Sequence, residues 1–475
     1  MRVLVPTGRQ SEAVLRAALA RVDDISFEIV VTGEIASFLT PAALEKLLRE
    51  RDADCAVVSG MCTASFSDVE ASCGIPVFLG TRHAADMALA VPLLKAGKLS
   101  RTMAADFLLT MEKQKEAERR LIEIEDKSDA AFSIRGVKIG CGAPVKIIYE
   151  IMDAPSVSNL RARADAAFAS GADIVDLGFG FDATEQDVIR CFSELADVSG
   201  ALSIDTLNPD LIRAGLFRAD LIFSLTDETL PLLAEDVKKS GAAAVLISRS
   251  GAPLEDIVKT AKAAGLTKVF ADPVLQPPLS GMVSSLAAYE KEYGCPKVLG
   301  CVNVIELMDA DSPGICAMLA AAAAETNCAA LLISEHSDKT RGCISEMRRA
   351  VSMMTLSRGR PYPKDTAING LILKEKRMRR EPALVYDEIR DAAAASEKLD
   401  YDPKGNFRIG IEDGWIVAVR HKKAIRGKNW YDVFSAVLDE EGVSLLDHAA
   451  YLGKELYKAE LALKFGRSFE QDGEF

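Results

Sequence analysis

The chain has 475 residues, of which 49% are hydrophobic and 27% are charged, and its formal net charge is −13. This length predicts two or three domains rather than a single core. The acidic charge disfavours a nucleic-acid-binding protein, which would need a basic face. No apolar run reaches the roughly 20 residues of a membrane span, which disfavours an integral membrane protein.

Cysteine and histidine usage predicts a reduced, cytoplasmic protein. The chain has ten cysteines and four histidines, and no CxxC pair supports a zinc ribbon or a thioredoxin-like motif. No residue is therefore assigned as a metal ligand. The N-terminal MRVLVP is predicted to start directly as a strand, without a signal-peptide pattern. Cysteines inside predicted strands and helices are expected to be buried thiols. They are Cys55, Cys191, Cys301, Cys316 and Cys328.

Residues 1–100 alternate β-branched and helical stretches, which predicts a small parallel α/β domain of the Rossmann-like type. Ligands of such sheets bind at the carboxyl ends of the strands, where Arg82 and His83 are candidate anion contacts. No GxGxxG or Walker-type loop supports nucleotide binding. The expected strands are Arg2–Pro6, Phe27–Val31, Cys55–Ser59 and Pro76–Leu79, and the expected helices are Ser11–Arg21, Pro41–Arg51 and His83–Lys95.

Residues 101–130 connect this domain to the next. The stretch 101–127 is predicted to be one long helix, whose charged second half is typical of a solvated face. A Gly/Cys-rich segment, Gly136–Pro144, leads into the third region.

Residues 136–358 are predicted to form a (β/α)8 TIM barrel. An apolar, β-rich run recurs there every 20 to 30 residues, eight times, with helical stretches between the runs, and this is the pattern of that fold. The runs are Val145–Ile151, Ile174–Leu177, Ala201–Ile204, Leu221–Phe223, Ala244–Ile247, Lys268–Phe270, Lys297–Val304 and Ala329–Ile333.

Four aspartates, Asp153, Asp176, Asp205 and Asp272, fall at or just past the predicted strand ends. Acidic residues are 70 of 475, about one position in eight, so this excess is suggestive. The carboxyl ends of the strands form the reactive face of a barrel. The sequence therefore indicates an acidic ligand site at that face.

Residues 365–475 are predicted to form a small α+β domain after the PYPKD linker. Asp413-Gly414 is a strong turn signal, and it predicts a hairpin of Phe407–Glu412 with Trp415–Arg420. Two helices are expected to follow, at Trp430–Leu438 and Ser444–Phe465, the second with an apolar stripe at 3–4 spacing.

The barrel segment resembles the pterin-binding domain of dihydropteroate synthases and pterin-dependent methyltransferases. Residues 162–181 resemble the second-strand motif of this family, and SIDT (203–206) matches its third strand. ADP (271–273) matches the sixth-strand DPG motif without the glycine, and SEHSD (334–338) loosely resembles its eighth strand. DPKGNF (402–407) and residues 447–463 resemble a domain that archaeal-type dihydropteroate synthase-related proteins carry behind the barrel, in organisms that use tetrahydromethanopterin-type C1 carriers.

The resemblance implies a reduced pterin as substrate or ligand. A pterin presents an amine and a ring N–H along one edge, and a single carboxylate accepts from both. By resemblance, Asp272 holds this edge, Asp205 holds the other side of the ring and Asp176 lines the same mouth. Helix N-capping is the alternative role for these acids. Asn303 is expected to support pterin N5, or to bond to its own turn.

Two further side chains, Phe179 and Phe181, are expected either to stack on the ring or to pack on the next helix.

The chain departs from the synthase pattern where pyrophosphate is handled. EIMDAP (150–155) is short compared with the synthase first loop, Ser224 and Leu225 replace its fourth-strand Asn-Asp, its seventh-strand lysine has no counterpart and Ser334 replaces an arginine. A leaving pyrophosphate needs positive charge or a metal such as Mg²⁺. Arg249 and His336 are the candidate catalytic residues that remain. Lys339 and Arg341 are expected in surface salt bridges, with Arg341 also a candidate anion contact.

These features favour a dihydropteroate synthase-like transferase that joins a pterin methyl donor to an arylamine. A pterin-dependent methyltransferase acting with a partner and a non-catalytic pterin-binding protein are the alternatives, because the acids fit all three. A homo-oligomer stays open.

Overall fold

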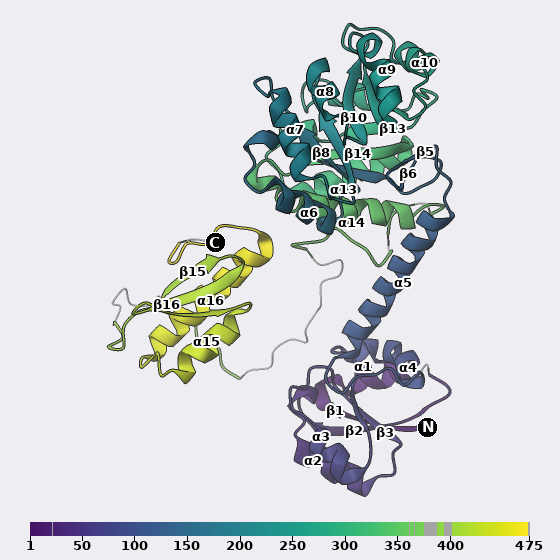
Figure 1. Ribbon diagram of the computed structural model, residues 1–475. Coiled ribbons are helices and arrows are strands. Elements are labelled where there is room, and N and C mark those ends of the chain that lie inside the picture. The colour runs from purple at the N-terminus through teal and green to yellow at the C-terminus, as the bar shows by residue number, and fades with distance from the viewer. Residues whose placement is uncertain (21, 361, 365, 375–386, 394–400, 474–475) are drawn as a thin grey trace. The chain divides into compact units, whose positions relative to one another are not determined.

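The computed structural model describes residues 1–475 except 21, 361, 365, 375–386, 394–400 and 474–475. Contacts within the chain divide it into two compact units, Met1–Gly370 and Leu371–Phe475 (Figure 1). In the part of the chain that is described, no helix combines the length and apolar character needed to cross a membrane.

The first unit begins with a parallel sheet of four strands in the order β2-β1-β3-β4. Val3 and Val5 of β1 pack against α1 and α4, whereas Leu4 between them packs against α2 and α3 on the other face. The alternation of apolar side chains along β1 thus produces three layers. The elements are β1 (Arg2–Gly8), α1 (Arg9–Leu19), β2 (Ser26–Gly33), α2 (Pro41–Glu50), β3 (Cys55–Val58), α3 (Ser67–Cys73), β4 (Val77–Leu79) and α4 (Met87–Lys95).

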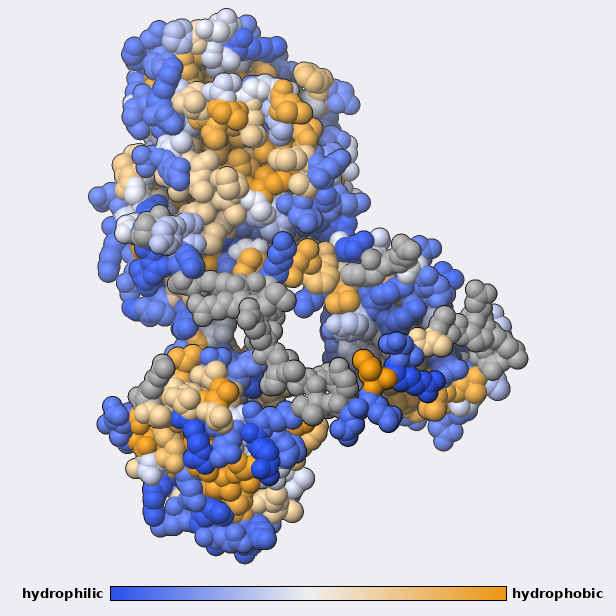
Figure 2. Space-filling view, turned by 180° about the vertical axis from the view of Figure 1, so that it is seen from behind, coloured by the Kyte–Doolittle hydropathy of each residue, from blue (hydrophilic) through white to orange (hydrophobic). Residues whose placement is uncertain are grey.

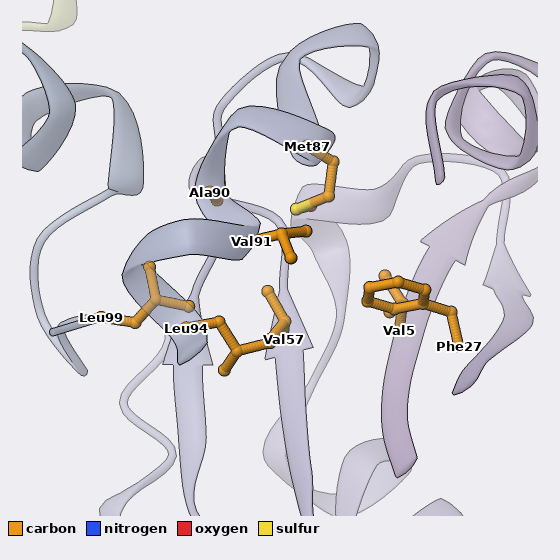
Figure 3. A pocket seen from close by; sticks show the side chains of 8 residues that line it. All are labelled: Val5, Phe27, Val57, Met87, Ala90, Val91, Leu94 and Leu99. Atoms are coloured by element: carbon orange, nitrogen blue, oxygen red, sulfur yellow. The ribbon is translucent and has the colours of Figure 1, made fainter. Parts of the chain in front are cut away.

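A small cavity lies between this sheet and α4. Figure 3 shows Val5 and Val57 on the strands facing Met87, Val91 and Leu94 on the helix. Its volume of about 10 Å³ is at the lower limit for a single water molecule, and its lining offers no polar side chain to hold one. The cavity is therefore a packing gap in the core and no ligand site.

Helix α5 (Ala105–Lys127) follows, four residues shorter at its start than the predicted 101–127. The Nζ of Lys138 donates to the backbone oxygens of Glu125, Asp126 and Ser128, each at 2.9 Å. A lysine at this position satisfies carbonyl groups that the end of the helix leaves without partners.

Eight parallel strands then close into a barrel in the order β10-β11-β12-β13-β14-β7-β8-β9 (Figure 1), and this confirms the predicted fold. The strands are β7 (Lys146–Ile151), β8 (Ile174–Gly178), β9 (Ala201–Asp205), β10 (Leu221–Thr226), β11 (Ala243–Ile247), β12 (Val269–Ala271), β13 (Lys297–Gly300) and β14 (Cys328–Ser334).

Helices lie between the strands. They are α6 (Leu160–Ser170), α7 (Glu185–Glu194), α8 (Pro209–Gly215), α9 (Leu230–Ser240), α10 (Leu254–Ala263), α11 (Met282–Ala288), α12 (Val302–Ile305), α13 (Ser312–Glu325) and α14 (Cys343–Leu356). The seventh predicted strand, Lys297–Val304, was wrong beyond Gly300, because Val302–Ile305 forms the short helix α12. The β-branched residues there favour a strand only weakly, and the buried contacts of Val304 and Ile305 decide the local structure.

A two-stranded hairpin closes the amino-terminal end of the barrel. β5 (Phe132–Ile134) pairs with β6 (Val137–Ile139), in the stretch that the sequence marked only as Gly/Cys-rich. Ile134 and Ile139 pack with the first inward-facing residues of the strands, and Phe132 contacts Phe270 edge to face at 5.2 Å. The interior is therefore accessible from the carboxyl end of the strands.

The second unit confirms the predicted hairpin and two helices and adds a third strand. β15 (Arg408–Glu412), β16 (Trp415–Arg420) and β17 (Lys423–Gly427) form an antiparallel sheet. α15 (Trp430–Asp439) and α16 (Leu446–Phe465) pack on it through the apolar stripe of α16, in which Leu452, Leu456 and Ala459 are fully buried.

Hydrophobic residues also reach the surface. Figure 2 shows a hydrophobic area on the barrel part of the first unit, bordered by hydrophilic residues. Exposed apolar side chains occur on loops that follow the barrel strands, at Phe181, Leu207, Leu279 and Leu307.

Candidate functional site at the carboxyl end of the barrel

Three carboxylates lie on adjacent strands and point into the barrel. Ile148 of β7, Ile174 of β8 and Ala201 of β9 belong to the interior cluster. Side chains alternate along a strand, so Glu150, Asp176 and Asp205 share the inward direction. Glu150 is the register partner of Asp176, and Gly178 is that of Asp205. We call Glu150, Asp176 and Asp205 the carboxylate triad.

Asp176 is fully buried, and neither of its carboxylate oxygens has a hydrogen-bond partner among the described residues. The buried hydroxyl of Ser203, opposite Asp176 on β9, is also unpartnered. Buried polar groups are nearly always hydrogen-bonded, and an exception indicates water, an ion or a ligand. The Ser203 hydroxyl is close enough to Asp176 to lower the pKa of the carboxyl, so it can partner one carboxylate oxygen, and the second oxygen is the one left for a ligand.

The surroundings of the carboxylate triad favour the protonated form of its three side chains. Burial, followed by the charges of Asp205 and Glu150, raises the pKa of Asp176 well above its ordinary value. Burial and the charge of Glu306 raise the pKa of Glu150 to about 7. Burial and the charge of Glu150 raise the pKa of Asp205 to about 7. Since like charges at close range disfavour ionisation, the three side chains share protons at neutral pH.

A pocket of about 360 Å³ opens at this end of the barrel. This volume matches a small planar molecule. Three of the twelve lining residues are acidic, and none of the twelve is a lysine, arginine or histidine. They are Glu150, Met152, Asp153, Gly178, Phe179, Gly180, Phe181, Asp205, Thr206, Leu207, Asn208 and Leu211.

Asp272 follows β12, on a different side of the barrel from the triad. Its Oδ1 accepts hydrogen bonds from the hydroxyl of Tyr289 at 2.7 Å and from the backbone N–H of Val274 at 2.8 Å. Burial raises its pKa to about 6. Val274 has a φ of +65°, so a β-branched residue occupies the left-handed conformation that glycine favours. This is the position at which the DPG motif carries its glycine.

Asn303 lies on helix α12 and not at a strand end. Its side chain is exposed, and Nδ2 donates to the backbone oxygen of Leu275 at 3.0 Å. The alternative of a bond to its own turn is therefore wrong. Support for a ring nitrogen stays a prediction.

Glu306 holds the loop after β14 in place. Its carboxylate accepts from the hydroxyls of Ser334, Ser337 and Thr340 and from the backbone N–H of His336. These bonds outweigh the effect of burial, so the pKa of Glu306 is lowered. Glu306 is thus an acceptor that stabilises this loop.

The candidate cations are dispersed. Arg249 and His336 are exposed, on the loops after β11 and β14. Lys339 pairs with Asp309 and Arg341 pairs with Asp338, which agrees with the surface salt bridges expected of them. The structure does not bring these four side chains together as one positive site.

Among the remaining candidates at the mouth, Phe179 is buried and stacks on Phe192 at 6.4 Å, as the packing alternative predicts. Phe181 is fully exposed and stays available to a ligand. Asp153 is exposed at the edge of the pocket. Two further acids follow α12: Asp309 is exposed and Asp311 precedes α13.

In the N-terminal sheet, Arg82 and His83 follow β4. The guanidinium of Arg82 lies over the ring of Phe107 at 4.6 Å and 3.6 Å from Asp106. Arg82 Nε and His83 Nε2 are buried without hydrogen-bond partners, so an anion contact stays a prediction.

A side chain at Gly60 would meet the backbone oxygen of Gly80 at 2.5 Å, which makes close packing the reason for that glycine.

All five cysteines predicted to be buried are buried, and all ten cysteines of the chain are free thiols. Cys316, Cys343 and Glu346 bring their ligand atoms within 4.8 Å of one another between α13 and α14. A hydrogen bond with Cys316 and burial raise the pKa of Cys343. A protonated thiol is a poor metal ligand, and core packing explains the pair.

Sequence reasoning missed Glu150, Ser203 and Tyr289 as members of the site. Glu150 could have been noted as a carboxylate near the end of the apolar run KIIYEI, although the sequence does not show that it points inward. Ser203 stood inside the quoted SIDT motif. Tyr289 is on a helix, and no local pattern links it to Asp272.

Fold and site together define a (β/α)8-barrel protein with an acidic ligand pocket at the carboxyl ends of its strands. Residues 401–472 match the family model described as PterinBD-DUF4346. The chain is 30% identical to the uncharacterized protein MJ0107 of Methanocaldococcus jannaschii, over 99% of this chain and 98% of that protein. It therefore belongs to this family, the archaeal-type dihydropteroate synthase-related proteins with additional N- and C-terminal domains.

Solved structures with similarity include a Yersinia pestis DHPS with a pterine-sulfa conjugate, 18% identical with a TM-score of 0.38, covering 46% of this chain and 95% of that one. A dihydropteroate synthase from Thermus thermophilus in complex with 6HMPPP is 21% identical with a TM-score of 0.37, covering 44% of this chain and 92% of that one.

Proposed function

We propose that this protein binds a reduced pterin at the carboxyl end of its barrel. We further propose that it acts as a dihydropteroate synthase-like transferase in the biosynthesis of a tetrahydromethanopterin- or folate-type C1 carrier. Asp176 carries the first part of the proposal. It is a fully buried carboxylate with two unpartnered oxygens, next to the open pocket. The N–H donors of a pterin edge would bond to these oxygens and favour the ionised form of the carboxyl, which burial otherwise disfavours.

Asp205 and Asp272 complete the proposed ring contacts, with Asn303 beside them. Both bonds to Asp272 fall on Oδ1, so Oδ2 is free to accept from the ligand. Arg249 and His336 are retained as the candidate catalytic residues, and Arg82, His83 and Arg341 as candidate anion contacts. Were Mg²⁺ to take part, the oxygens of Glu150 and Asp205 offer the hard ligands it prefers.

Titration calorimetry with a reduced pterin tests the binding. The wild-type protein is expected to bind with micromolar or better affinity, and Asp272→Ala is expected to abolish binding. Loss of a hydrogen bond to a charged acceptor costs about 1.5–3 kcal/mol. Asp165→Ala, which removes an exposed carboxylate on α6, is the matched control. An unchanged titration of Asp272→Ala would refute the pterin assignment.

The transferase step is tested with a pterin pyrophosphate, an arylamine ribosyl phosphate and Mg²⁺. Product formation supports the synthase. Absence of turnover at saturating substrate favours a pterin-dependent methyltransferase acting with a partner, or a non-catalytic pterin-binding protein. The lack of a cation among the twelve pocket residues favours this second group, because neither member of it has to hold a pyrophosphate.

A further inference from the structure

We infer that the pocket selects a hydrogen-bond-donating ring that carries no phosphate, and that Glu150 is the residue that sets this selection. The inference rests on the first part of the proposed function, the binding of a reduced pterin, and it favours the two alternatives to the synthase, neither of which has to hold a pyrophosphate.

The charge of the pocket is its first support. Glu150, Asp153 and Asp205 line it, and its other nine lining residues are uncharged. A phosphate group placed there would meet like charge in a partly desolvated site, where Coulomb interactions are stronger than in water. An uncharged or cationic ring meets no such penalty.

The hydrogen-bonding capacity of the carboxylates is the second support. An ionised carboxylate only accepts hydrogen bonds, and this applies to the pocket-lining Glu150 and Asp205 above their pKa values of about 7. The hydroxyl of Ser203 either donates or accepts. Asp176 and Ser203 are fully buried and do not line the pocket, so the carboxylates that a ligand meets on these strands are Glu150 and Asp205. Amino and ring N–H groups match these acceptors, whereas phosphate oxygens, themselves acceptors, do not.

Two arginines on the helices that follow β7 and β8 are held by hydrogen bonds elsewhere. Arg163, on the helix after β7, donates to the hydroxyl of Tyr149 at 2.9 and 2.6 Å and to the backbone oxygen of Glu335. Arg190, on the helix after β8, donates to Asp187 and to the backbone oxygen of Pro155. Neither guanidinium can turn towards an anion in the pocket without giving up these bonds.

Glu150 is singled out by its position. It lines the pocket and is the register partner of the buried Asp176. It also lies on β7, at the start of the segment that is short compared with a synthase first loop. Glu150→Gln keeps the size and shape of the side chain and removes its charge, so this variant isolates the electrostatic effect.

The test compares a hydroxymethyl reduced pterin with its pyrophosphate ester by titration calorimetry on the full chain, once with EDTA and once with Mg²⁺. The unphosphorylated pterin is expected to bind at least tenfold more tightly than the ester under both conditions. Glu150→Gln is expected to narrow this ratio to less than about threefold. Glu185→Gln, a matched change at an exposed position on α7, is expected to preserve it.

The inference would be overturned if the wild-type protein bound the pyrophosphate ester as tightly as the unphosphorylated pterin or more tightly. This holds even if such binding occurs only in the presence of Mg²⁺, and the proposal of pterin binding would then remain intact. An unchanged ratio in Glu150→Gln would remove Glu150 as its cause. Binding of neither compound would instead refute the proposed function and this inference with it. The wild-type comparison needs no variant, so it holds even if Glu150→Gln fails to fold.

Discussion

The hydroxyl of Tyr289 donates a hydrogen bond of 2.7 Å to Oδ1 of Asp272, and both side chains are buried. Burial and the neighbouring carboxylate raise the pKa of Tyr289, so the phenol stays protonated and acts as a donor. Tyr289 therefore fixes one oxygen of Asp272 and leaves the other to face the interior.

We expect Tyr289→Phe to lower the free energy of unfolding by about 1–3 kcal/mol, because it leaves a buried acceptor with one donor fewer. Urea denaturation measures this change. Tyr431→Phe, at an exposed position on α15, is the control and is expected to change stability by less than about 0.5 kcal/mol. Equal effects of the two variants would show that the bond to Asp272 contributes nothing.

The triad predicts that stability falls as the pH rises from about 4 to above 7. The pKa values of Glu150 and Asp205 in the folded protein, each about 7, lie above those of the unfolded chain. The folded state therefore binds these protons more tightly. Its advantage is complete below the unfolded pKa values and is lost as the pH rises through the folded ones.

We expect the free energy of unfolding to fall by about 2–4 kcal/mol between pH 5 and pH 8. Asp176→Asn removes a buried group that itself holds a proton in this range, so the free energy of unfolding of this variant is expected to fall by less. Urea denaturation at each pH measures the slope, with Asp165→Asn as the control. The same slope in Asp176→Asn and in the wild-type protein would contradict the shared-proton arrangement.

Glu306→Ala is expected to loosen the loop after β14. It removes an acceptor for four hydrogen bonds and is expected to cost about 1–3 kcal/mol of stability. Amide hydrogen exchange of residues 334–341 is expected to speed up, while the rest of the barrel is unchanged. Glu325→Ala, at the exposed end of α13, is the control. Unchanged exchange of the loop would mean that the loop is held by other contacts.

Asp402→Asn is expected to destabilise the second unit. The side chain accepts from the backbone N–H groups of Lys404, Ser444 and Leu445, from the hydroxyl of Ser444 and from Nδ1 of His448. These bonds lower its pKa despite burial, so its contribution is present above the ordinary pKa of an aspartate and is lost only in stronger acid.

Tryptophan fluorescence reports this change selectively, since the two tryptophans of the chain, Trp415 and Trp430, both lie in the second unit. The melting temperature read from fluorescence is expected to fall in Asp402→Asn. Asp439→Asn, at the exposed end of α15, is expected to leave it unchanged. A fall of the same size in both variants would remove the special role of Asp402.

The barrel was predictable because its strands are buried on both faces and read as continuous apolar runs. The acids at the strand ends were predictable for the same reason, since a carboxylate after such a run is conspicuous. Ser334 stands where the synthase pattern has an arginine, and the sequence showed only that this positive charge is missing. In the structure, the hydroxyl of Ser334 donates a hydrogen bond to Glu306.

The contents of the site were less predictable. The inward direction of Glu150 depends on the register of β7 with β8, which no local pattern fixes. The bond from Tyr289 to Asp272 joins residues 17 apart through the fold. β17 was missed because Lys423–Gly427 has mostly exposed side chains, so it lacks the apolar alternation that marks a strand.

The β5–β6 hairpin at the base of the barrel has a consequence for the order of events at the site. With that end closed by Ile134 and Ile139, whatever enters and whatever leaves must use the same opening. Under the proposed transferase function, a product that still occupies the pocket blocks the next pterin from arriving. Product and pterin should therefore exclude each other from the pocket, and the product has to leave before the next pterin binds.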